Sequence, residues 1–179
     1  MRRRLSKVLV LYSTVDGHTL KICRRLKELL EAARHEVTLA ALDERADVDL
    51  APFDKIVVGA SIRYGRHRPG VARFMRANRA ALEAKPSAFF SVNIVARKPG
   101  RSTPQTNPYV RKFLRQIAWR PRALGVFAGR LDYPSYGYWD RHIIRFIMLL
   151  TGGPTDPRTA AEFTDWSEVE RFARAIGEM

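Results

Sequence analysis

Residues 8–19 of the chain read Val8-Leu9-Val10-Leu11-Tyr12-Ser13-Thr14-Val15-Asp16-Gly17-His18-Thr19. The first five residues form an unbroken apolar run, which is typical of a strand buried on both faces of a sheet. The next seven are mostly small or polar, and they lead into residues 20–33, where apolar side chains recur at helical spacing. The stretch therefore predicts a buried strand, a short loop and a helix, the first unit of a parallel α/β sheet.

The same alternation of strand and helix patterns continues to the end of the chain. We expect further strands at residues 36–40, 55–60, 87–92 and 124–128, and further helices at residues 71–82, 109–118 and 166–176. This order predicts a doubly wound α/β domain with a five-stranded parallel sheet, spanning residues 5–177. Ligands of such domains bind beyond the carboxyl ends of the strands.

Two stretches are longer than the connections of a minimal α/β repeat. Residues 94–108 contain three prolines and three basic residues without periodicity, so we expect a long loop, and loops of this length are usually functional. Residues 131–157 open with several aromatic side chains and end in Thr151-Gly152-Gly153-Pro154. We interpret this second stretch as an insertion after or within the fifth strand.

The charge of the chain is strongly positive and unevenly distributed. The 179 residues include 32 basic and 18 acidic ones, a formal net charge of +14. Residues 55–131 alone contain 17 Lys and Arg but one acidic residue, Glu83. Such a field favours phosphates, carboxylates or an anionic membrane surface as partners.

Cysteine usage and hydropathy restrict the class of protein further. The one cysteine, Cys23, excludes a disulfide framework and any multi-thiolate metal site. No apolar stretch reaches the roughly 18 residues that a membrane-spanning helix needs. The apolar run after the basic N-terminus is also too short for a signal peptide. We therefore expect a cytoplasmic chain whose membrane contact is peripheral.

The loop Ser13-Thr14-Val15-Asp16-Gly17-His18-Thr19 is a candidate anion site. Hydroxyl groups and a glycine at a helix N-terminus suit an anion, because unpaired N–H groups and the helix dipole both point toward it. The loop contains neither the Gly-Lys-Ser/Thr of a Walker loop nor Gly-x-Gly-x-x-Gly. An ordinary helix N-cap is the alternative interpretation.

Two more strand ends carry small and hydroxyl-bearing residues. Ala60-Ser61-Ile62-Arg63-Tyr64-Gly65 follows the third strand, and Ser91-Val92-Asn93 ends the fourth. The three segments together resemble the flavodoxin pattern, in which the first loop holds the phosphate of FMN and the other two flank its isoalloxazine ring. The resemblance implies FMN as cofactor, with contacts from Ser13, Thr14, Val15, Asp16, Gly17, His18, Thr19, Ala60, Ser61, Ile62, Arg63, Tyr64, Gly65, Ser91, Val92 and Asn93.

Longer motifs over nearly the whole chain give a closer resemblance. They are Gly59-Ala60-Ser61-Ile62-Arg63-Tyr64-Gly65, Ser91-Val92-Asn93, Val95-Ala96-Arg97-Lys98-Pro99, Thr103-Pro104-Gln105-Thr106-Asn107, Trp119-Arg120-Pro121, Gly152-Gly153 and Thr164-Asp165-Trp166. Together they resemble the bacterial quinone-dependent protoporphyrinogen IX dehydrogenases, which are flavodoxin-like proteins.

That resemblance implies both a fold and a reaction. The expected fold is flavodoxin-like, with a long-chain type insertion at about residues 131–157. The expected activity, within haem biosynthesis, is FMN-dependent oxidation of protoporphyrinogen IX to protoporphyrin IX, with electrons passed to a respiratory quinone, menaquinone or ubiquinone. The expected location is peripheral, on the cytoplasmic face of the bacterial inner membrane.

The propionate groups of a porphyrinogen suit arginine side chains, which form forked bonds to carboxylates. We expect substrate contacts from Arg63, Arg97, Lys98 and Arg101, with Arg63 and Arg97 as the leading pair. For each of these bases, a solvated surface charge is the alternative.

No residue stands out as a catalytic acid or base. His18, His35, His67 and His142 have neither metal-ligand nor triad spacing. We therefore predict no metal and name no catalytic residue.

Residues 139–150 are amphipathic if they form a helix. Trp139, Ile143, Phe146, Ile147 and Leu150 share one face, opposite Asp140, Arg141 and Arg145. We expect the apolar face to contact an anionic membrane or the quinone dissolved in it, beside the basic surface. A core helix, a homo-oligomer contact and a contact with the porphyrinogen are the alternatives.

Two other classes of function compete with the dehydrogenase. A flavodoxin-type FMN electron carrier or a quinone reductase would share the first loop, but a carrier needs neither the basic long loop nor the insertion. A nucleic-acid-binding module would account for the positive charge, yet the chain contains no recognised nucleic-acid motif. We therefore expect no nucleic-acid partner.

Overall fold

The computed structural model describes residues 5–42 and 48–179. Its centre is a twisted sheet with parallel strands in the order β2-β1-β3-β5-β6, to which the short strand β4 adds an antiparallel pairing with β3. The strands are β1 (Lys7–Ser13), β2 (Glu36–Ala41), β3 (Lys55–Arg63), β4 (Arg66–His67), β5 (Ser87–Val92) and β6 (Ala123–Phe127). The order reverses between β1 and β3, as in a doubly wound sheet.

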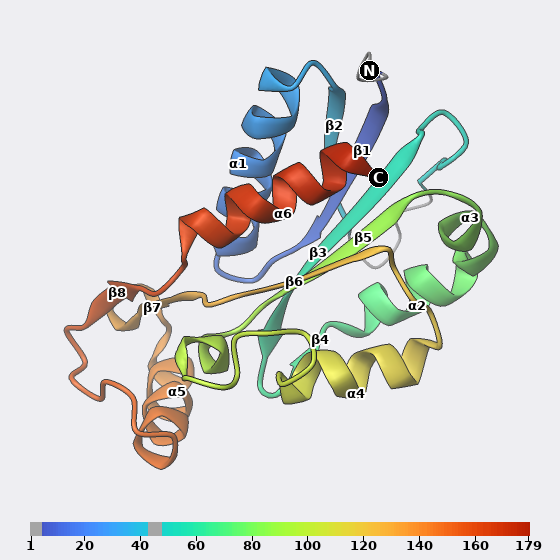
Figure 1. The fold of residues 1–179 in the computed structure, drawn as a ribbon. Helices are drawn as coiled ribbons and strands as arrows, with labels where there is room; N and C mark the ends of the chain where they lie inside the picture. Colours follow the sequence, from blue (N-terminus) through green and yellow to red (C-terminus); the bar gives the residue numbers. More distant parts are fainter. Residues whose placement is uncertain (1–4, 43–47) are drawn as a thin grey trace.

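Helices cover both faces of this sheet (Figure 1). On one face lie α1 (His18–Ala32) and α6 (Trp166–Glu178). On the other lie α2 (Pro69–Ala77), α3 (Arg79–Ala84) and α4 (Pro108–Ile117). We refer to the sheet with these helices as the α/β body.

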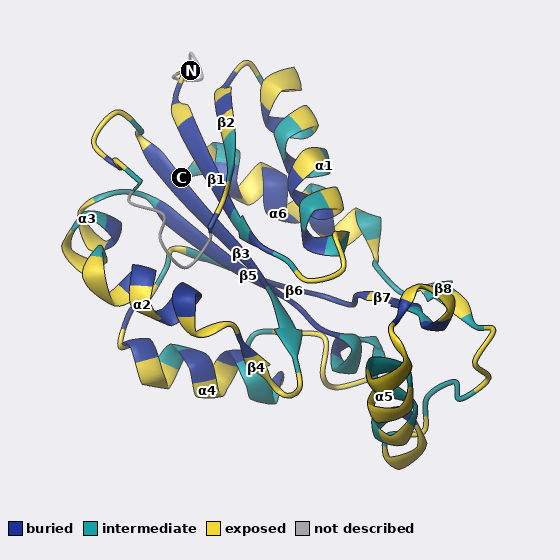
Figure 2. Ribbon diagram, turned by 180° about the vertical axis from the view of Figure 1, so that it is seen from behind, coloured by how far each residue is buried: buried dark blue, intermediate teal, exposed yellow. Residues whose placement is uncertain are grey.

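The unbroken apolar run of β1 is explained by burial on both faces. Val8 and Val10 pack in the core under α1 and α6, whereas Leu9 and Leu11 pack in the core under α2 and α4. All four side chains are at most 1% exposed. Figure 2 shows the central strands β1, β3 and β5 buried over most of their length, whereas the edge strand β2 is only partly buried.

The structure departs from the predicted elements at two places before the insertion. The helix predicted at 71–82 is divided at Asn78, whose side-chain amide donates to the Phe74 carbonyl at 3.0 Å and competes with the helical pattern. Strand β3 continues to Arg63 instead of ending at residue 60. It does so because it forms a hairpin with β4, in which Tyr64 and Gly65 both have positive φ.

The two long stretches are ordered. Residues 94–108 begin with a 3-10 turn, η1 (Ile94–Arg97), and end at Asn107, whose side chain accepts from the Tyr109 and Val110 N–H groups and caps α4. After β6 the chain forms β7 (Arg130–Asp132), η2 (Tyr133–Ser135), α5 (Tyr138–Leu150) and β8 (Ala160–Glu162). Strands β7 and β8 pair antiparallel in a separate small sheet. We call residues 130–162 the insertion; it lies beside the α/β body (Figure 1).

Among the described residues, no helix is both long enough and apolar enough to cross a membrane.

Gly59 provides a test of the packing that holds β3 against β5. It pairs with Phe90, and a Cβ placed on Gly59 would lie 2.1–2.8 Å from three atoms of the Phe90 ring. We expect Gly59→Ala to lower the free energy of unfolding by about 1–3 kcal/mol, because the ring has to move within a close-packed core.

Gly177 in α6 is the matched control, since its added Cβ would meet the nearest atom at an ordinary 3.5 Å. Gly177→Ala is expected to be neutral or to stabilise by up to about 1 kcal/mol. Urea denaturation measures both variants, and equal stability of Gly59→Ala and the parent would contradict the packing argument.

Candidate functional site

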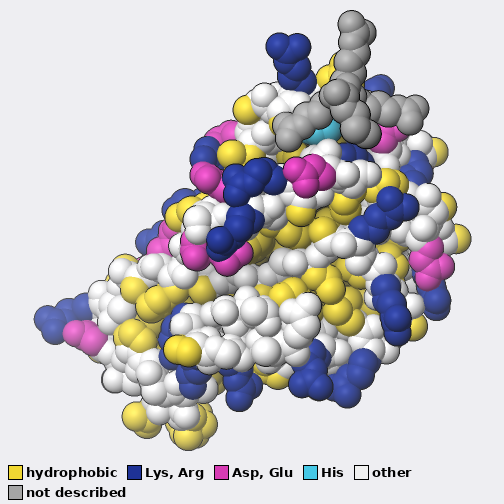
Figure 3. Space-filling model, in the orientation of Figure 1, with side chains coloured by type: hydrophobic (Ala, Val, Ile, Leu, Met, Phe, Trp, Pro, Cys, Tyr) yellow, Lys and Arg dark blue, Asp and Glu magenta, His cyan; other side chains and the backbone are white. Residues whose placement is uncertain are grey.

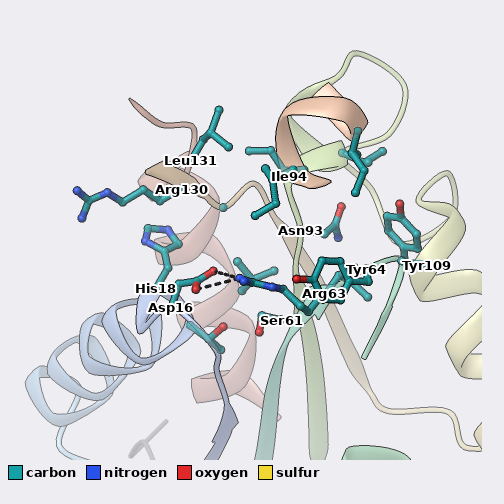
Figure 4. A pocket seen from close by; sticks show the side chains of 18 of the residues that line it. Asp16, His18, Ser61, Arg63, Tyr64, Asn93, Ile94, Tyr109, Arg130 and Leu131 are labelled. Atoms are coloured by element: carbon teal, nitrogen blue, oxygen red, sulfur yellow. Dashed lines mark hydrogen bonds and ion pairs between the residues drawn. The ribbon is translucent and has the colours of Figure 1, made fainter. Parts of the chain in front are cut away.

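A cavity lies where the carboxyl ends of β1, β3 and β5 meet the insertion (Figure 4). Its volume is about 130 Å³. Side chains from the α/β body form three walls, and side chains of the insertion close the fourth. The lining residues are Thr14, Asp16, His18, Thr19, Ser61, Ile62, Arg63, Tyr64, Gly65, Val92, Asn93, Ile94, Val95, Tyr109, Gly129, Arg130, Leu131, Tyr136, Ile144, Ile147 and Met148.

The first wall is the N-terminus of α1, which is open to an anion. Gly17 precedes the helix with φ of 76°, and within residues 5–42 and 48–179 no side chain caps the first turn. The hydroxyl oxygens of Thr14 and Thr19 are buried and have no hydrogen-bond partner among the described residues. Buried hydroxyls are rarely left unsatisfied. Two of them beside free helical N–H groups fit the oxygens of a phosphate.

His18 tethers this loop to the segment between β8 and α6. Its Nε2 lies 2.6 Å from the Thr164 hydroxyl, which itself donates to the Ala128 carbonyl at 2.7 Å. Because that hydroxyl proton is used, the hydroxyl accepts from Nε2–H, which assigns the proton of the neutral ring to Nε2. Burial lowers the pKa of His18, so the ring is neutral near pH 7.

The second wall centres on Arg63, at the end of β3. Its guanidinium contacts both carboxylate oxygens of Asp16, at 2.9 and 3.0 Å, and also the carboxylate of Asp140 from α5. The Tyr64 hydroxyl donates to the same Asp140 carboxylate. The guanidinium carbon lies 5.3 Å from the Tyr64 ring centre and 5.6 Å from that of Tyr136. One arginine thus joins the first loop to the insertion.

The third wall is held by a buried polar network around Asn93. The Asn93 side-chain oxygen accepts from the Ala96 N–H at 3.0 Å and from the Asn107 amide at 3.1 Å. Its amide donates to the Ser91 hydroxyl, which also contacts His67 Nε2 at 3.0 Å. Burial lowers the pKa of His67 to about 3, so this ring is neutral as well. The network fixes both ends of the long loop against β5.

Most of the residues expected to contact a cofactor lie on the cavity. They are Thr14, Asp16, His18, Thr19, Ser61, Ile62, Arg63, Tyr64, Gly65, Val92 and Asn93. The remaining five, Ser13, Val15, Gly17, Ala60 and Ser91, are not among its lining residues. Ser13, Ala60 and Ser91 are buried in the strands, and Val15 is exposed.

The bases expected to bind substrate are not brought together. Arg63 lines the cavity, whereas Arg97, Lys98 and Arg101 do not. Arg97 donates to the Ile94 carbonyl at 3.1 Å and packs against Gly153, where its own burial lowers its pKa. The proposed pair of Arg63 and Arg97 therefore has one member on the cavity.

Sequence reasoning missed part of the lining. Gly129, Arg130 and Leu131 follow β6, whose carboxyl end lies at the same edge of the sheet as the other three, so the strand order could have indicated them. Other missed residues come from the long loop, the start of α4 and the insertion. These are Ile94, Val95, Tyr109, Tyr136, Ile144 and Met148.

The outward face of α5 is apolar and exposed. Trp139 is 76% exposed, Phe146 61% and Leu150 70%, with Tyr138, Ile143 and Leu149 also exposed. Figure 3 shows apolar side chains projecting at the lower left, where α5 lies in Figure 1. Ile147, which was expected on this face, instead lines the cavity.

Within residues 5–42 and 48–179, no three His, Cys, Asp or Glu side chains are grouped closely enough to hold a metal ion.

Comparisons with known proteins agree with this geometry. The family described as "Flavodoxin domain" matches residues 9–158. A protoporphyrinogen IX dehydrogenase (quinone) from Escherichia coli strain K12 is 42% identical over 173 residues, which cover 97% of this chain and 96% of that protein. A protein of the same name from Leishmania major is 42% identical over 174 residues, covering 97% of this chain and 75% of that protein.

Solved structures show the same fold. The flavodoxin of Megasphaera elsdenii matches with a TM-score of 0.58 at 13% identity, covering 96% of this chain and 99% of that one. Flavodoxin 2 of Bacillus cereus matches with a TM-score of 0.55 at 18% identity, covering 96% and 98%. The predicted flavodoxin-like fold is thereby confirmed. By its matched domain and its identity to these relatives, the chain belongs to the flavodoxin-like family of quinone-dependent protoporphyrinogen IX dehydrogenases.

Proposed function

We propose that the chain oxidises protoporphyrinogen IX to protoporphyrin IX with FMN as its bound cofactor and a membrane quinone as the final electron acceptor. The observation that carries the proposal is the cavity at the carboxyl edge of the sheet. It combines an open helix N-terminus, two hydroxyls without a hydrogen-bond partner among the described residues, and a partly buried arginine. The 42% identity to relatives named for this reaction supports the same conclusion.

The α1 loop would hold the FMN phosphate. Thr14 and Thr19 would donate their hydroxyl protons, and the free N–H groups of the first turn would add to them. Tyr64, Asn93 and Tyr109 line the part of the cavity farther from this loop and would position the ring system. When bound, FMN supplies two-electron chemistry, and the conversion of the porphyrinogen to the porphyrin requires three such oxidations.

The residues of this chain would otherwise orient the substrate and exclude water. Arg63 is the base on the cavity that we propose for a substrate propionate, because a guanidinium binds a carboxylate with charge-assisted bonds. Ile94, Ile144 and Ile147 offer apolar contacts to the tetrapyrrole ring. We name no acid or base for the reaction.

Access to a quinone dissolved in lipid would come through α5. We propose that its exposed apolar face enters the interface of an anionic membrane, on the cytoplasmic side of the bacterial inner membrane. Exposed bases on α4, namely Arg111, Lys112 and Arg115, would lie near the lipid headgroups. Each base close to an anionic surface contributes about 1 kcal/mol, so a few bases and partial burial of the helix give reversible attachment.

An anaerobic assay tests the function as a whole. The purified chain, saturated with FMN, is given protoporphyrinogen IX and a soluble quinone, and the fluorescence of protoporphyrin IX is followed. We expect porphyrin formation that depends on both FMN and the quinone. Reduction of the quinone by a nicotinamide cofactor without porphyrin formation would identify a quinone reductase instead.

Thr19 provides the sharpest test of the phosphate site. Thr19→Val keeps the shape of the side chain but removes a buried hydroxyl that has no partner in the part of the chain that the structure describes. Without FMN the variant should therefore be more stable than the parent, by about 1 kcal/mol. FMN should bind about tenfold to a hundredfold more weakly, because one charge-assisted hydrogen bond is lost.

Thr151→Val is the matched control, since the Thr151 hydroxyl is also buried and unpartnered among the described residues but does not line the cavity. It should stabilise the flavin-free chain and leave FMN affinity unchanged. Flavin fluorescence titration measures affinity, and parent-like FMN binding by Thr19→Val would disprove the phosphate contact.

The substrate contact is tested with Arg63→Ala. We expect the KM for protoporphyrinogen IX to rise about tenfold to a hundredfold, with FMN still bound. Arg97→Ala serves as comparison, because Arg97 lies outside the cavity lining. If Arg97→Ala raised the KM more than Arg63→Ala, the propionate would be assigned to a base of the long loop instead of Arg63.

The membrane contact is tested with the double substitution Phe146→Glu/Leu150→Glu. Cosedimentation with vesicles rich in anionic lipid should decrease strongly, and parent binding should weaken with added salt. Ala32→Glu/Ala175→Glu adds the same charge at exposed sites on α1 and α6, on the face of the sheet opposite α4, and should reduce binding less. Equal binding by the two double variants would exclude a specific role for the apolar face.

A further inference from the structure

Within the insertion, α5 is bonded to its neighbouring loops, whereas Glu162 in β8 bonds to Lys21 and Trp166 of the α/β body, at 2.6 and 2.8 Å. Arg141 Nε donates to the Tyr133 carbonyl at 3.1 Å, and Arg145 Nε donates to the Thr155 carbonyl at 2.8 Å. The Tyr133 hydroxyl donates to the Pro154 carbonyl at 2.7 Å. The arginine side chains of α5 thus hydrogen-bond to neighbouring loops of the same segment. Because of these bonds, α5 and the loops can move as a unit.

The polar link between α5 and the α/β body is concentrated on one side chain. Asp140 contacts the guanidinium of Arg63 and accepts from the Tyr64 hydroxyl. Across the part of the chain that the structure describes, these are the only side-chain hydrogen bonds or ion pairs that α5 makes to the body. The Tyr64 hydrogen bond, together with Arg63, lowers the pKa of Asp140, so this carboxylate stays ionised near neutral pH.

The same helix closes the cavity. Ile144, Ile147 and Met148 line it, and Met148 is 1% exposed. The cavity volume of about 130 Å³ is below the roughly 300–1,000 Å³ of sites that hold a drug-sized ligand. A tetrapyrrole therefore cannot enter unless part of the lining moves, and α5 is the helix of the insertion in that lining.

The charge of Arg63 is already balanced by two carboxylates. Its side chain is 17% exposed and bridges Asp16 and Asp140. A third carboxylate at this guanidinium would bring like charges together in a partly desolvated place, which is costly. Exchange of one resident carboxylate for a substrate propionate avoids this cost.

We propose that Asp140 is a positioning residue that occupies the place of a substrate carboxylate on Arg63 and so latches α5 over the cavity. A propionate displaces it, and α5 then moves away from the body with the loops bonded to it, while Glu162 keeps the end of the insertion on α1. Asp140 is the group that leaves because it belongs to the insertion, whereas Asp16 lies in the α1 loop and keeps both oxygens on Arg63. The substrate thereby opens its own site. The identity of the displacing carboxylate as a porphyrinogen propionate rests on the proposed function. The latch between Asp140 and Arg63 does not.

Thiol labelling can report the opening directly. The one native cysteine, Cys23, is fully buried, and burial raises its pKa, so it gives little background. Met148→Cys places a thiol under the closed insertion. Ile143→Cys places one on the outward face, where the parent side chain is 43% exposed. Ile144→Cys is the second inward position if Met148→Cys folds poorly.

The first comparison needs no porphyrin. In the FMN-saturated chain carrying Met148→Cys, we expect Asp140→Asn to raise the labelling rate about tenfold to a hundredfold, the factor that corresponds to one charge-assisted contact. Labelling of Ile143→Cys should not change. Asp156→Asn is the matched control, because Asp156 also lies in the insertion but pairs with Arg158. Equal rates with and without Asp140→Asn, at both inward positions, would overturn the latch.

The second comparison tests displacement by a carboxylate. Protoporphyrin IX, the product with both propionates, should raise the labelling rate of Met148→Cys in the otherwise unchanged chain, whereas its dimethyl ester should not. Equal opening by the acid and the ester would overturn displacement through Arg63. If absorbance titration shows that neither porphyrin binds, the proposed function fails, and the latch is then decided by the first comparison alone.

Discussion

The parallel register of three strands is the constraint on which the site depends. Ser13 of β1 lies beside Ala60 of β3, and Ala60 lies beside Ser91 of β5. Because parallel strands point the same way, the segments that follow these residues emerge at one edge of the sheet. A shift of one residue in either pairing would exchange the two faces of a strand. The cores on both sides of the sheet, which bury alternate residues of β1, prevent that shift.

The insertion uses the two sides of one helix for different purposes. The side of α5 that carries Ile144 and Met148 completes the cavity, and the side that carries Trp139 and Phe146 faces outward. Its arginines bond to neighbouring carbonyls instead of covering the outer surface. An exposed apolar face on a helix whose polar groups turn inward is the reverse of the usual arrangement in a water-soluble domain.

The order of strands, loops and helices was predictable because it depends on local patterns. Unbroken apolar runs gave the strands, and the shared direction of parallel strands brought Thr14, Ser61 and Asn93 to one edge. The break at Asn78 was not predictable from periodicity, since the apolar spacing continues across it. It depends on a side-chain bond to the backbone.

The direction of side chains in irregular segments could not be predicted from the sequence either. Arg97 follows the segment Ser91-Val92-Asn93 in sequence. The direction of its side chain, however, is fixed by a hydrogen bond to the Ile94 carbonyl and by contact with Gly153 of the insertion. Ile147 lies at the border between the two faces of α5, so its side depends on how the helix is rotated about its axis. The interaction of Asp140 with Arg63 joins residues 77 positions apart, and no local pattern indicates it.

The basic residues of the chain fall into two groups, those paired with carboxylates on the cavity and those exposed on the outer surface. On the cavity, Arg63 is balanced by Asp16 and Asp140, and Arg130 pairs with Asp132. In contrast, α2 and α4 contain several arginines and no acidic residue. Bases on the outer surface act over about 8 Å at physiological ionic strength, which suits the approach of a dicarboxylate or an anionic surface. In the cavity, by contrast, Arg63 is already paired, so a ligand binds it by replacing one of its carboxylates. The outer bases thus attract anions in general, whereas Arg63 discriminates among those that reach the cavity.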